Sequence, residues 1–352
     1  RSGFKGNNLS FFVLSSMRLI ALFYIGFCWL FMSCGGPVAD PASLAVQPTI
    51  KELHFEEAFF KMDTLKFEAS LTKLAQQYPE FSEDYFSRIL MMSPKKEAKS
   101  ILAFYKAYLP IYLESKKVNA SKIATPQITE AIKRFHYFFP QYTLPKQLIY
   151  FIGPLETYGN VVTKEGIAIG LQLYLGSESS WYFSEQINTI YPRYISRQFA
   201  PEFIVVNSLQ NMLNDYEPIA LNGKKLVEQM IEIGKRQYIM AQCMPNAQDS
   251  LLMGYTGNQM KAIKENTGDI WSFLSSQNRL FSEDPSITKA LLTEAPYNDY
   301  FGEDIPGNVG KYMGYLIVKS YMDNQKKETQ NDLNALLKIP AMTIFNEAEI
   351  DF

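Results

Sequence analysis

The segment FIVVNSLQNML spans Phe203 to Leu213 and predicts the central helix of the folded domain. Pro201 and Glu202 precede it and suit a first helical turn, because proline needs no N–H donor there and a carboxylate meets the positive end of the helix dipole. Two sets of residues recur at helical spacing. The apolar set is Val205, Val206, Leu209, Met212 and Leu213, and the amide set is Asn207, Gln210, Asn211 and Asn214. The expected element is a half-buried helix with an uncharged stripe of amides. On spacing alone, these amides would contact loops or water.

The segments on either side of this helix predict an α+β fold that is predominantly helical. Branched and aromatic residues bounded by glycine and proline indicate a small β-sheet, with Lys164-Glu165-Gly166 as a hairpin turn. Apolar periodicity indicates helices both before and after this sheet, and the early ones are expected to break near prolines. The strand ranges are Lys146–Gly153 and Asn160–Gly176, and the helical ranges are Ile50–Met92, Lys95–Lys117, Thr125–Phe139, Leu221–Met240, Met253–Leu274 and Gly310–Asn324.

The amino-terminal region has the pattern of a bacterial lipoprotein signal peptide. Met17 and Arg18 form a short charged region, and Leu19 to Met32 is an apolar run too short to span a bilayer comfortably. The run ends at Ser33-Cys34-Gly35, which is similar to a lipobox and makes Cys34 the expected lipidated residue. An ordinary signal peptide or an anchor helix with an incidental cysteine is the alternative. Residues 1–16 precede the better start at Met17 and are expected to be an over-extended reading frame.

These signals divide the chain into four parts. An over-extended start and signal peptide occupy residues 1–33, and a lipidated tether follows at 34–49. A helical part at 50–145 and the sheet with its following helices at 146–352 complete the chain, although 50–352 as a single domain is an alternative.

Composition excludes several classes of function. The formal net charge of -2, without a basic stripe between the aromatics, argues against a nucleic-acid partner. Of the three cysteines, Cys243 would be left without a partner once Cys28 leaves with the signal peptide and Cys34 carries lipid. We therefore expect no disulfide, and we interpret Cys243 as a buried structural thiol.

Counting histidines excludes the ordinary zinc-peptidase motif. HExxH requires two imidazoles on one helical face, whereas the chain has only His54 and His136, which lie in separate segments. Each of the two is expected to be a packed or surface residue. GxSxG, Walker A and GxGxxG patterns are absent, and Glu228 and Glu232 have the spacing of a solvated helix face. The residues thus predict no catalytic group, no metal and no cofactor.

A series of short motifs resembles the gliding-motility-associated lipoprotein family GldB of the Bacteroidetes. The order and spacing of the motifs make the resemblance specific, and it covers roughly residues 50 to 345. The motifs are Leu171-Gln172-Leu173-Tyr174-Leu175-Gly176, Leu226-Val227-Glu228-Gln229-Met230-Ile231-Glu232 with Gly234-Lys235, Tyr255-Thr256, Ile270-Trp271, Glu294-Ala295-Pro296, Pro306-Gly307-Asn308-Val309-Gly310 and Gly314-Tyr315-Leu316-Ile317-Val318-Lys319-Ser320-Tyr321.

That family itself resembles predicted zinc peptidases in which a strand ending YLG precedes an HExxH helix and a later helix supplies a glutamate ligand. By order, Asn207 and Asn211 would replace the histidines, Ser208 the catalytic glutamate, and Glu232 would be the third ligand. Amides are poor zinc ligands and a serine hydroxyl does not carry out a carboxylate's proton transfer at neutral pH. The resemblance therefore implies a zincin-like body without catalysis, whose cleft candidates are Asn207, Ser208, Gln210, Asn211 and Glu232.

The resemblance implies a lipid-anchored, non-catalytic envelope protein of the gliding and type IX secretion kind, bound to a membrane through Cys34 and acting by binding an envelope protein partner. In this phylum an acidic cluster after the lipidated cysteine is associated with surface display. No such cluster follows Cys34, so we expect the domain to face the periplasm. An extended partner segment could add to an edge strand such as Gly166 to Leu175 beside the amide stripe. Two alternatives are a residual metal-dependent peptidase with atypical ligands, Glu232 among them, and a purely structural spacer.

Overall fold

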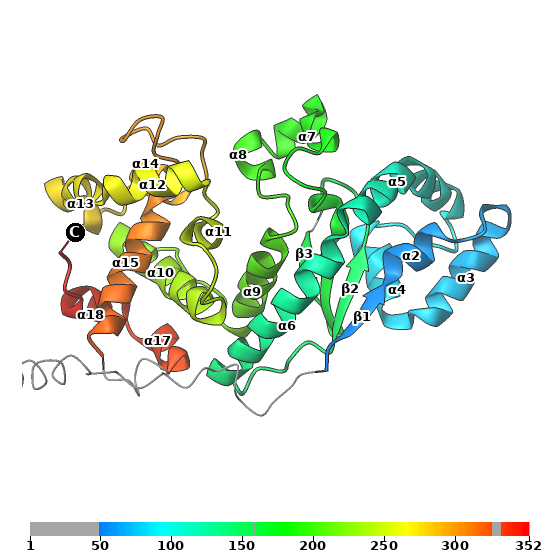
Figure 1. Cartoon of the computed structure of the whole chain (residues 1–352), viewed down its shortest axis with the longest axis horizontal. Coiled ribbons are helices and arrows are strands. Elements are labelled where there is room, and N and C mark those ends of the chain that lie inside the picture. Colours follow the sequence, from blue (N-terminus) through cyan, green and yellow to red (C-terminus); the bar gives the residue numbers. More distant parts are fainter. Residues whose placement is uncertain (1–48, 158, 326–331, 352) are drawn as a thin grey trace, which may run out of the picture. The chain divides into compact units, whose positions relative to one another are not determined.

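The computed structural model describes residues 49–157, 159–325 and 332–351. The predicted signal peptide, the lipidation site Cys34 and the tether lie outside this range, apart from the last residue of the tether. Within the described residues, no helix combines the length and the apolar character that a membrane span requires. The fold is predominantly helical α+β, as predicted (Figure 1).

A four-stranded mixed sheet lies between helices that come from both sides of it in the sequence. The strands are β1 (Lys51–His54), β2 (Gln147–Phe151), β3 (Asn160–Val162) and β4 (Gly166–Gly170), in the order β1-β2-β4-β3. β1, β2 and β4 are parallel, whereas β3 forms an antiparallel hairpin with β4. The hairpin confirms the predicted turn at Lys164-Glu165-Gly166. Because β4 pairs on both sides, the expectation that Gly166 to Leu175 offers an open edge is wrong, and Leu171–Leu173 turns into a 3₁₀ helix.

The segment before the sheet is helical except at its start. Lys51–His54 pairs with β2, so the prediction of a helix from Ile50 is wrong at this end. This segment forms an edge strand of the sheet, and local periodicity does not reveal a pairing with a distant strand. Helices α5 and α6 continue through Pro110 and Pro126, which contradicts the expected breaks. Each proline removes only one helical hydrogen bond, and the helices are held by their buried faces. The elements here are α2 (Phe55–Phe60), α3 (Phe67–Gln77), α4 (Pro79–Asp84), a π-helix (Tyr85–Ile89), α5 (Ala98–Val118) and α6 (Ala120–Phe138).

The predicted central helix is α9 (Phe203–Tyr216), and it packs against α6 and β3. Its apolar set is buried as expected, whereas Gln210 and Asn214 are exposed. Short elements connect the sheet to this helix: 3₁₀ segments at Leu171–Leu173 and Ser180–Phe183, then α7 (Glu185–Ile190) and α8 (Arg193–Ser196).

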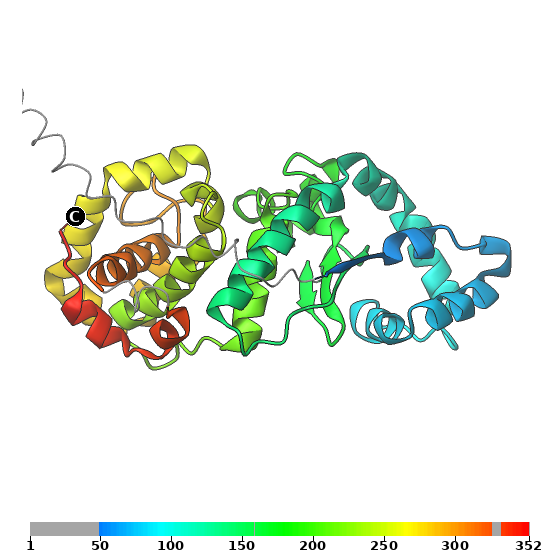
Figure 2. The same cartoon turned by 60° about the horizontal axis from the view of Figure 1, so that its bottom comes forward.

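The remaining helices pack around α10 (Leu226–Cys243) and α15 (Val309–Asp323). Figure 2 shows α15 in orange beside the red carboxyl-terminal helices, and α10 contacts both α15 and these helices. The close approach of the two helices depends on Gly234 and Gly314. The other elements are α11 (Asp249–Met253), α12 (Gly257–Glu265), α13 (Thr267–Ser275), a 3₁₀ segment (Ser276–Phe281), α14 (Pro285–Leu292), α17 (Leu333–Lys338) and α18 (Ala341–Glu347).

Candidate functional site

Two amide side chains of α9, Asn207 and Asn211, face Tyr174 and β3. The Asn207 side chain donates a hydrogen bond from Nδ2 to the hydroxyl of Tyr174, at 2.9 Å. That hydroxyl in turn donates to Oδ1 of Asn160, the first residue of β3, at 2.7 Å. Tyr174 is buried, and burial raises the pKa of its hydroxyl, so the phenol stays neutral and acts as a link in a chain of hydrogen bonds.

Asn160 lies at the centre of this polar network. Its Nδ2 donates to the Ser208 hydroxyl at 2.8 Å and to the carbonyl of Ile204 at 3.1 Å. Its own carbonyl accepts from Nδ2 of Asn211 at 2.7 Å. The Ser208 hydroxyl, which is buried, also donates to the carbonyl of Ile204 at 2.7 Å. The candidates Asn207, Ser208 and Asn211 are thus brought together, but they fasten α9 to the sheet edge.

Glu232 has partners of a different kind. Its Oε1 lies 2.9 Å from Nζ of Lys224, and its Oε2 lies 3.2 Å from Nζ of Lys235. Lys235 is buried and also donates to the carbonyl of Ile339 at 2.6 Å. Burial lowers the pKa of this ammonium group and Glu232 raises it. The carboxylate therefore compensates a buried lysine, and its polar contacts among the described residues are with these two lysines, not with Asn207 or Asn211.

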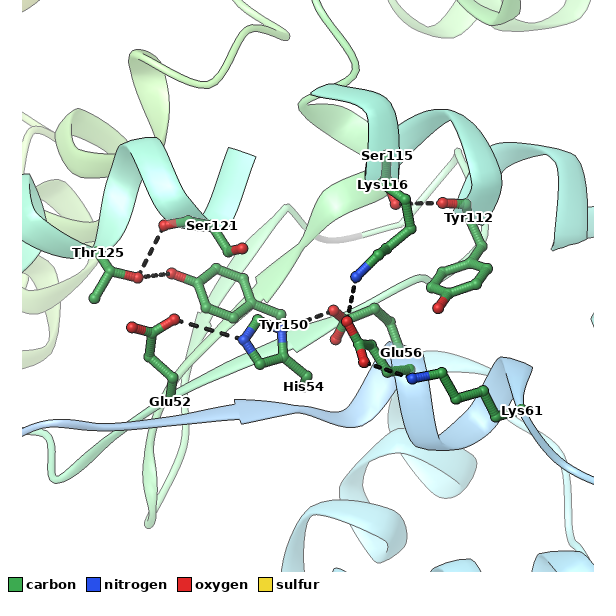
Figure 3. Close-up of polar contacts among 11 residues, drawn as sticks. Glu52, His54, Glu56, Lys61, Tyr112, Ser115, Lys116, Ser121, Thr125 and Tyr150 are labelled. Atoms are coloured by element: carbon green, nitrogen blue, oxygen red, sulfur yellow. Dashed lines mark hydrogen bonds and ion pairs between the residues drawn. The ribbon is translucent and has the colours of Figure 1, made fainter. Parts of the chain in front are cut away.

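A second polar cluster surrounds His54 at the end of β1 (Figure 3). Nδ1 of His54 lies 2.9 Å from Oε1 of the buried Glu56, and Nε2 lies 3.6 Å from Oε2 of Glu52. The imidazole stacks on Tyr150 with 5.3 Å between ring centroids. A hydrogen bond with Glu56 raises the pKa of His54 against the opposing effect of burial. The two flanking carboxylates favour the protonated imidazole.

The same cluster contains a set of metal-ligand atoms. Atoms of His54, Glu56 and Glu57 lie within 4.8 Å of one another, and Oε2 of Glu56 is buried without a hydrogen-bond partner. However, Glu57 already bonds Lys61 at 2.8 Å as well as Lys116, and these lysines lower its pKa to about 2. A cation would have to displace two ammonium groups, so the arrangement fits an internal ion-pair network better than a metal centre.

A cavity with charged and aromatic lining opens at the amino-terminal end of α9. It has a volume of about 800 Å³, which is within the usual range for ligand sites. Its charged lining comes from Arg193 and Arg197 of the α8 segment and from Glu178 and Glu202. The remaining lining residues are Ser177, Tyr194, Phe203, Gln248, Ser250, Leu251, Gly254, Tyr255 and Thr256.

The two arginines of the cavity differ in their partners. Arg193 donates to Oε1 of Glu178 at 2.8 Å and to the carbonyl of Ser177 at 2.6 Å, so a carboxylate already balances its charge. Arg197 donates to the carbonyl of Gly254 at 2.9 Å and to the side-chain oxygen of Gln259, both of which are neutral. Desolvation lowers the pKa of Arg197, although a guanidinium keeps its charge in a protein.

Several motif residues that were far apart in the sequence meet behind this cavity. The Tyr255 hydroxyl donates to the carbonyl of Asn308 at 2.7 Å. Oε1 of Glu294 accepts from Nδ2 of Asn308 at 3.0 Å and lies 3.3 Å from Nζ of Lys311. Asn308 has a φ of 60°, a left-handed conformation that asparagine tolerates better than most residues. These contacts fix the cavity wall where α12 begins.

Sequence reasoning did not identify the cavity arginines. Their signal was weak: two arginines four residues apart, just before the predicted helix, would lie on one helical face. Nothing local shows that the second of them reaches Gly254, which lies 57 residues later.

Comparison with known proteins gives one match. The profile of the family described as "Gliding motility protein GldB" matches residues 39–350. No curated protein and no solved structure matches the chain. Because the matched region covers most of the chain, the protein belongs to the GldB family of gliding motility proteins.

Proposed function

We propose that the protein is a non-catalytic, lipid-anchored component of the cell envelope that binds a protein partner of the gliding machinery through the cavity beside α9. Family membership supports the link to gliding motility. The cavity carries the binding proposal, because it combines charged and aromatic side chains at the end of the central helix. Lipid attachment at Cys34 and a periplasmic domain belong to the same proposal and rest on the sequence pattern.

The chemistry of the side chains supports a binding role rather than catalysis. Asn207, Ser208 and Asn211 donate their hydrogen bonds to neighbouring protein atoms. Cys243 is buried, and burial raises the pKa of its thiol, which makes it a poor nucleophile. Among the described residues, no base is hydrogen-bonded to the Ser208 hydroxyl or to the Cys243 thiol, and nucleophilic catalysis needs such a base.

A residual metal-dependent peptidase is the second proposal, and the ligand atoms around His54, Glu56 and Glu57 are the observation in its favour. Zinc loading of the full-length protein, followed by desalting and elemental mass spectrometry, tests it. We expect less than stoichiometric zinc. Stoichiometric zinc that is lost in both His54→Ala and Glu56→Gln would favour the enzyme and would direct attention to peptide substrates.

In-cell photo-crosslinking tests the binding role of the cavity. A photoreactive amino acid replaces Gln248, an exposed lining residue for which no side-chain hydrogen bond is found in the described part of the chain. The matched control places it at Lys122, which is exposed on α6 and does not line the cavity. The proposal predicts a discrete adduct from position 248 that position 122 does not give. Equal adduct patterns, or none from position 248 at normal protein levels, would contradict it.

A further inference from the structure

We infer that the cavity recognises a carboxylate of an extended peptide and that Arg197 is the residue that binds it. This inference rests on the proposed binding function and specifies the chemistry of the partner. The carboxylate comes either from an acidic side chain or from the carboxyl terminus of the partner, and both sources present the same group to the guanidinium.

Of the two cavity arginines, Arg197 is the one that forms no ion pair with any described residue, whereas Arg193 pairs with Glu178. Its two hydrogen-bond acceptors among the described residues, the carbonyl of Gly254 and the side chain of Gln259, are uncharged. In the described part of the chain, no carboxylate forms an ion pair with it. Glu294 is near enough to raise the pKa of Arg197 electrostatically, but its hydrogen bonds through Oε1 go to Lys311 and Asn308. A half-buried guanidinium with neutral partners favours an incoming anion that can accept charge-assisted hydrogen bonds.

The contrast with Arg193 explains why Arg197 is singled out. Glu178 already balances Arg193 at 2.8 Å, and the Arg193 guanidinium lies 4.5 Å from the centroid of the Phe183 ring. Phe183 itself is 49% exposed and lies against a side chain that lines the cavity. Arg193 and Phe183 together therefore present an apolar and cationic surface beside the cavity, which suits a peptide side chain next to the carboxylate.

Local backbone structure positions Arg197 and adds to the positive potential. Gly254 has a φ of +69°, and a Cβ atom there would lie 2.9 Å from Nε2 of Gln198. The glycine thus lets its carbonyl approach both Arg197 and Gln198. Thr256, the residue that caps α12, also lines the cavity, so the positive end of this nine-residue helix faces the same space. A carboxylate bound to Arg197 would gain from that dipole.

A peptide fits the cavity better than a small anion. Tyr194, Phe203 and Tyr255 supply aromatic lining, and a volume of about 800 Å³ exceeds what a lone carboxylate would fill. Glu178 and Glu202 also line the cavity, and their negative charge discourages ligands of high anionic charge such as polyphosphates. One carboxylate accompanied by apolar groups satisfies both features.

Isothermal titration of the full-length lipidated protein in detergent micelles tests the inference with three tetrapeptides of the same length. Acetyl-Ala-Phe-Glu-Ala-amide offers an acidic side chain, acetyl-Ala-Phe-Ala-Ala offers a free carboxyl terminus, and acetyl-Ala-Phe-Ala-Ala-amide is neutral. We expect at least one carboxylate peptide to bind about tenfold more tightly than the neutral peptide. Which peptide gains identifies the source of the carboxylate.

Variants then assign the preference to one residue. Arg197→Gln removes the charge and should abolish the tenfold preference, whereas Arg197→Lys, which keeps the charge but not the two-pronged geometry, should retain part of it. Arg88→Gln is the matched control, since Arg88 is an exposed arginine outside the cavity that pairs with Asp84. Circular dichroism checks folding, and the lysine variant provides the test if the glutamine variant does not fold.

The outcomes separate this inference from the proposed function. Equal affinity of wild-type protein for all three peptides, or no binding of any of them, overturns the inference even if position 248 gives a specific adduct in cells. A carboxylate preference that survives Arg197→Gln, or that Arg197→Lys leaves undiminished, overturns it as well. Conversely, a preference that depends on Arg197, without an adduct in cells, would leave the carboxylate site standing and remove the proposed partner function.

Discussion

Gly234 and Gly314 face each other where α10 crosses α15. A Cβ atom on Gly234 would lie 2.2 Å from the carbonyl oxygen of Gly314, and one on Gly314 would lie 1.8 Å from the carbonyl oxygen of Met230. The obstruction is backbone, which cannot rotate away as a side chain can. The contact between the two helices therefore depends on the absence of a side chain at both positions.

Gly234→Ala is expected to destabilise the protein by about 3 kcal/mol or more, because forcing an extra carbon into a packed contact costs more than the roughly 1 kcal/mol that alanine gains in helix propensity. Chemical denaturation measures the free energy of unfolding. Gly257→Ala in α12 is the matched control, since a Cβ there meets nothing within 4 Å. If both variants are equally stable, the close packing of α10 on α15 is refuted.

Asn160→Ala should cost about 1–3 kcal/mol, because it leaves the buried Tyr174 hydroxyl without its acceptor and the buried Ser208 hydroxyl without its amide donor. Urea unfolding of the full-length protein checks the loss. The control is Gln210→Ala, at an exposed position on α9, which should change stability by less than about 0.5 kcal/mol. A neutral Asn160→Ala would mean that α9 is not fastened to β3 through these side chains.

Glu232→Gln should destabilise the fold by about 3 kcal/mol, the cost of leaving the buried ammonium group of Lys235 without a carboxylate. The control is Glu265→Gln, whose side chain is 63% exposed and lies 3.8 Å from Lys261, with an expected effect below about 1 kcal/mol. Thermal unfolding compares the two. A role as a metal ligand would instead appear as a loss of bound zinc with little change in the metal-free protein.

The contribution of His54 to stability should depend on pH. Because Glu56 and Glu52 raise its folded-state pKa above 6.5, its stabilising effect is complete below 6.5 and is lost as pH rises through the folded pKa. We therefore expect His54→Gln to destabilise more at pH 5.5 than at pH 8.5, as measured by denaturant titration at the two values.

Glu56→Gln keeps the shape of the side chain and removes its charge. In this background the pH-dependent part of the His54→Gln effect should fall, because the largest cause of the raised pKa is the hydrogen bond to Glu56. Nuclear magnetic resonance titration of the imidazole gives an independent readout. An unchanged His54 pKa in Glu56→Gln would show that the contact with Glu56 is not what raises the pKa of His54.

Much of the secondary structure could be predicted because it is encoded locally. The apolar and amide faces of α9 follow from spacing alone, and the turn between β3 and β4 follows from its glycine-containing sequence. β1 could not be predicted, since the sequence KELH at Lys51–His54 is charged and short, and it becomes a strand only by pairing with β2 nearly a hundred residues later. The predicted helix breaks at Pro110 and Pro126 were wrong, because burial of the apolar helix faces outweighed the local cost of a proline.

The same distinction between local sequence and tertiary structure holds for the candidate site. The sequence by itself determined that the chain has no HExxH motif, that α9 carries uncharged amides and that the family is GldB. Tertiary structure decided what those groups contact: Asn211 bonds Asn160 across 51 residues, and Arg197 bonds Gly254 across 57. Helix and turn propensities act over a few residues, whereas the partner of a polar side chain is set by which distant segments the core brings together, and local sequence does not contain that information.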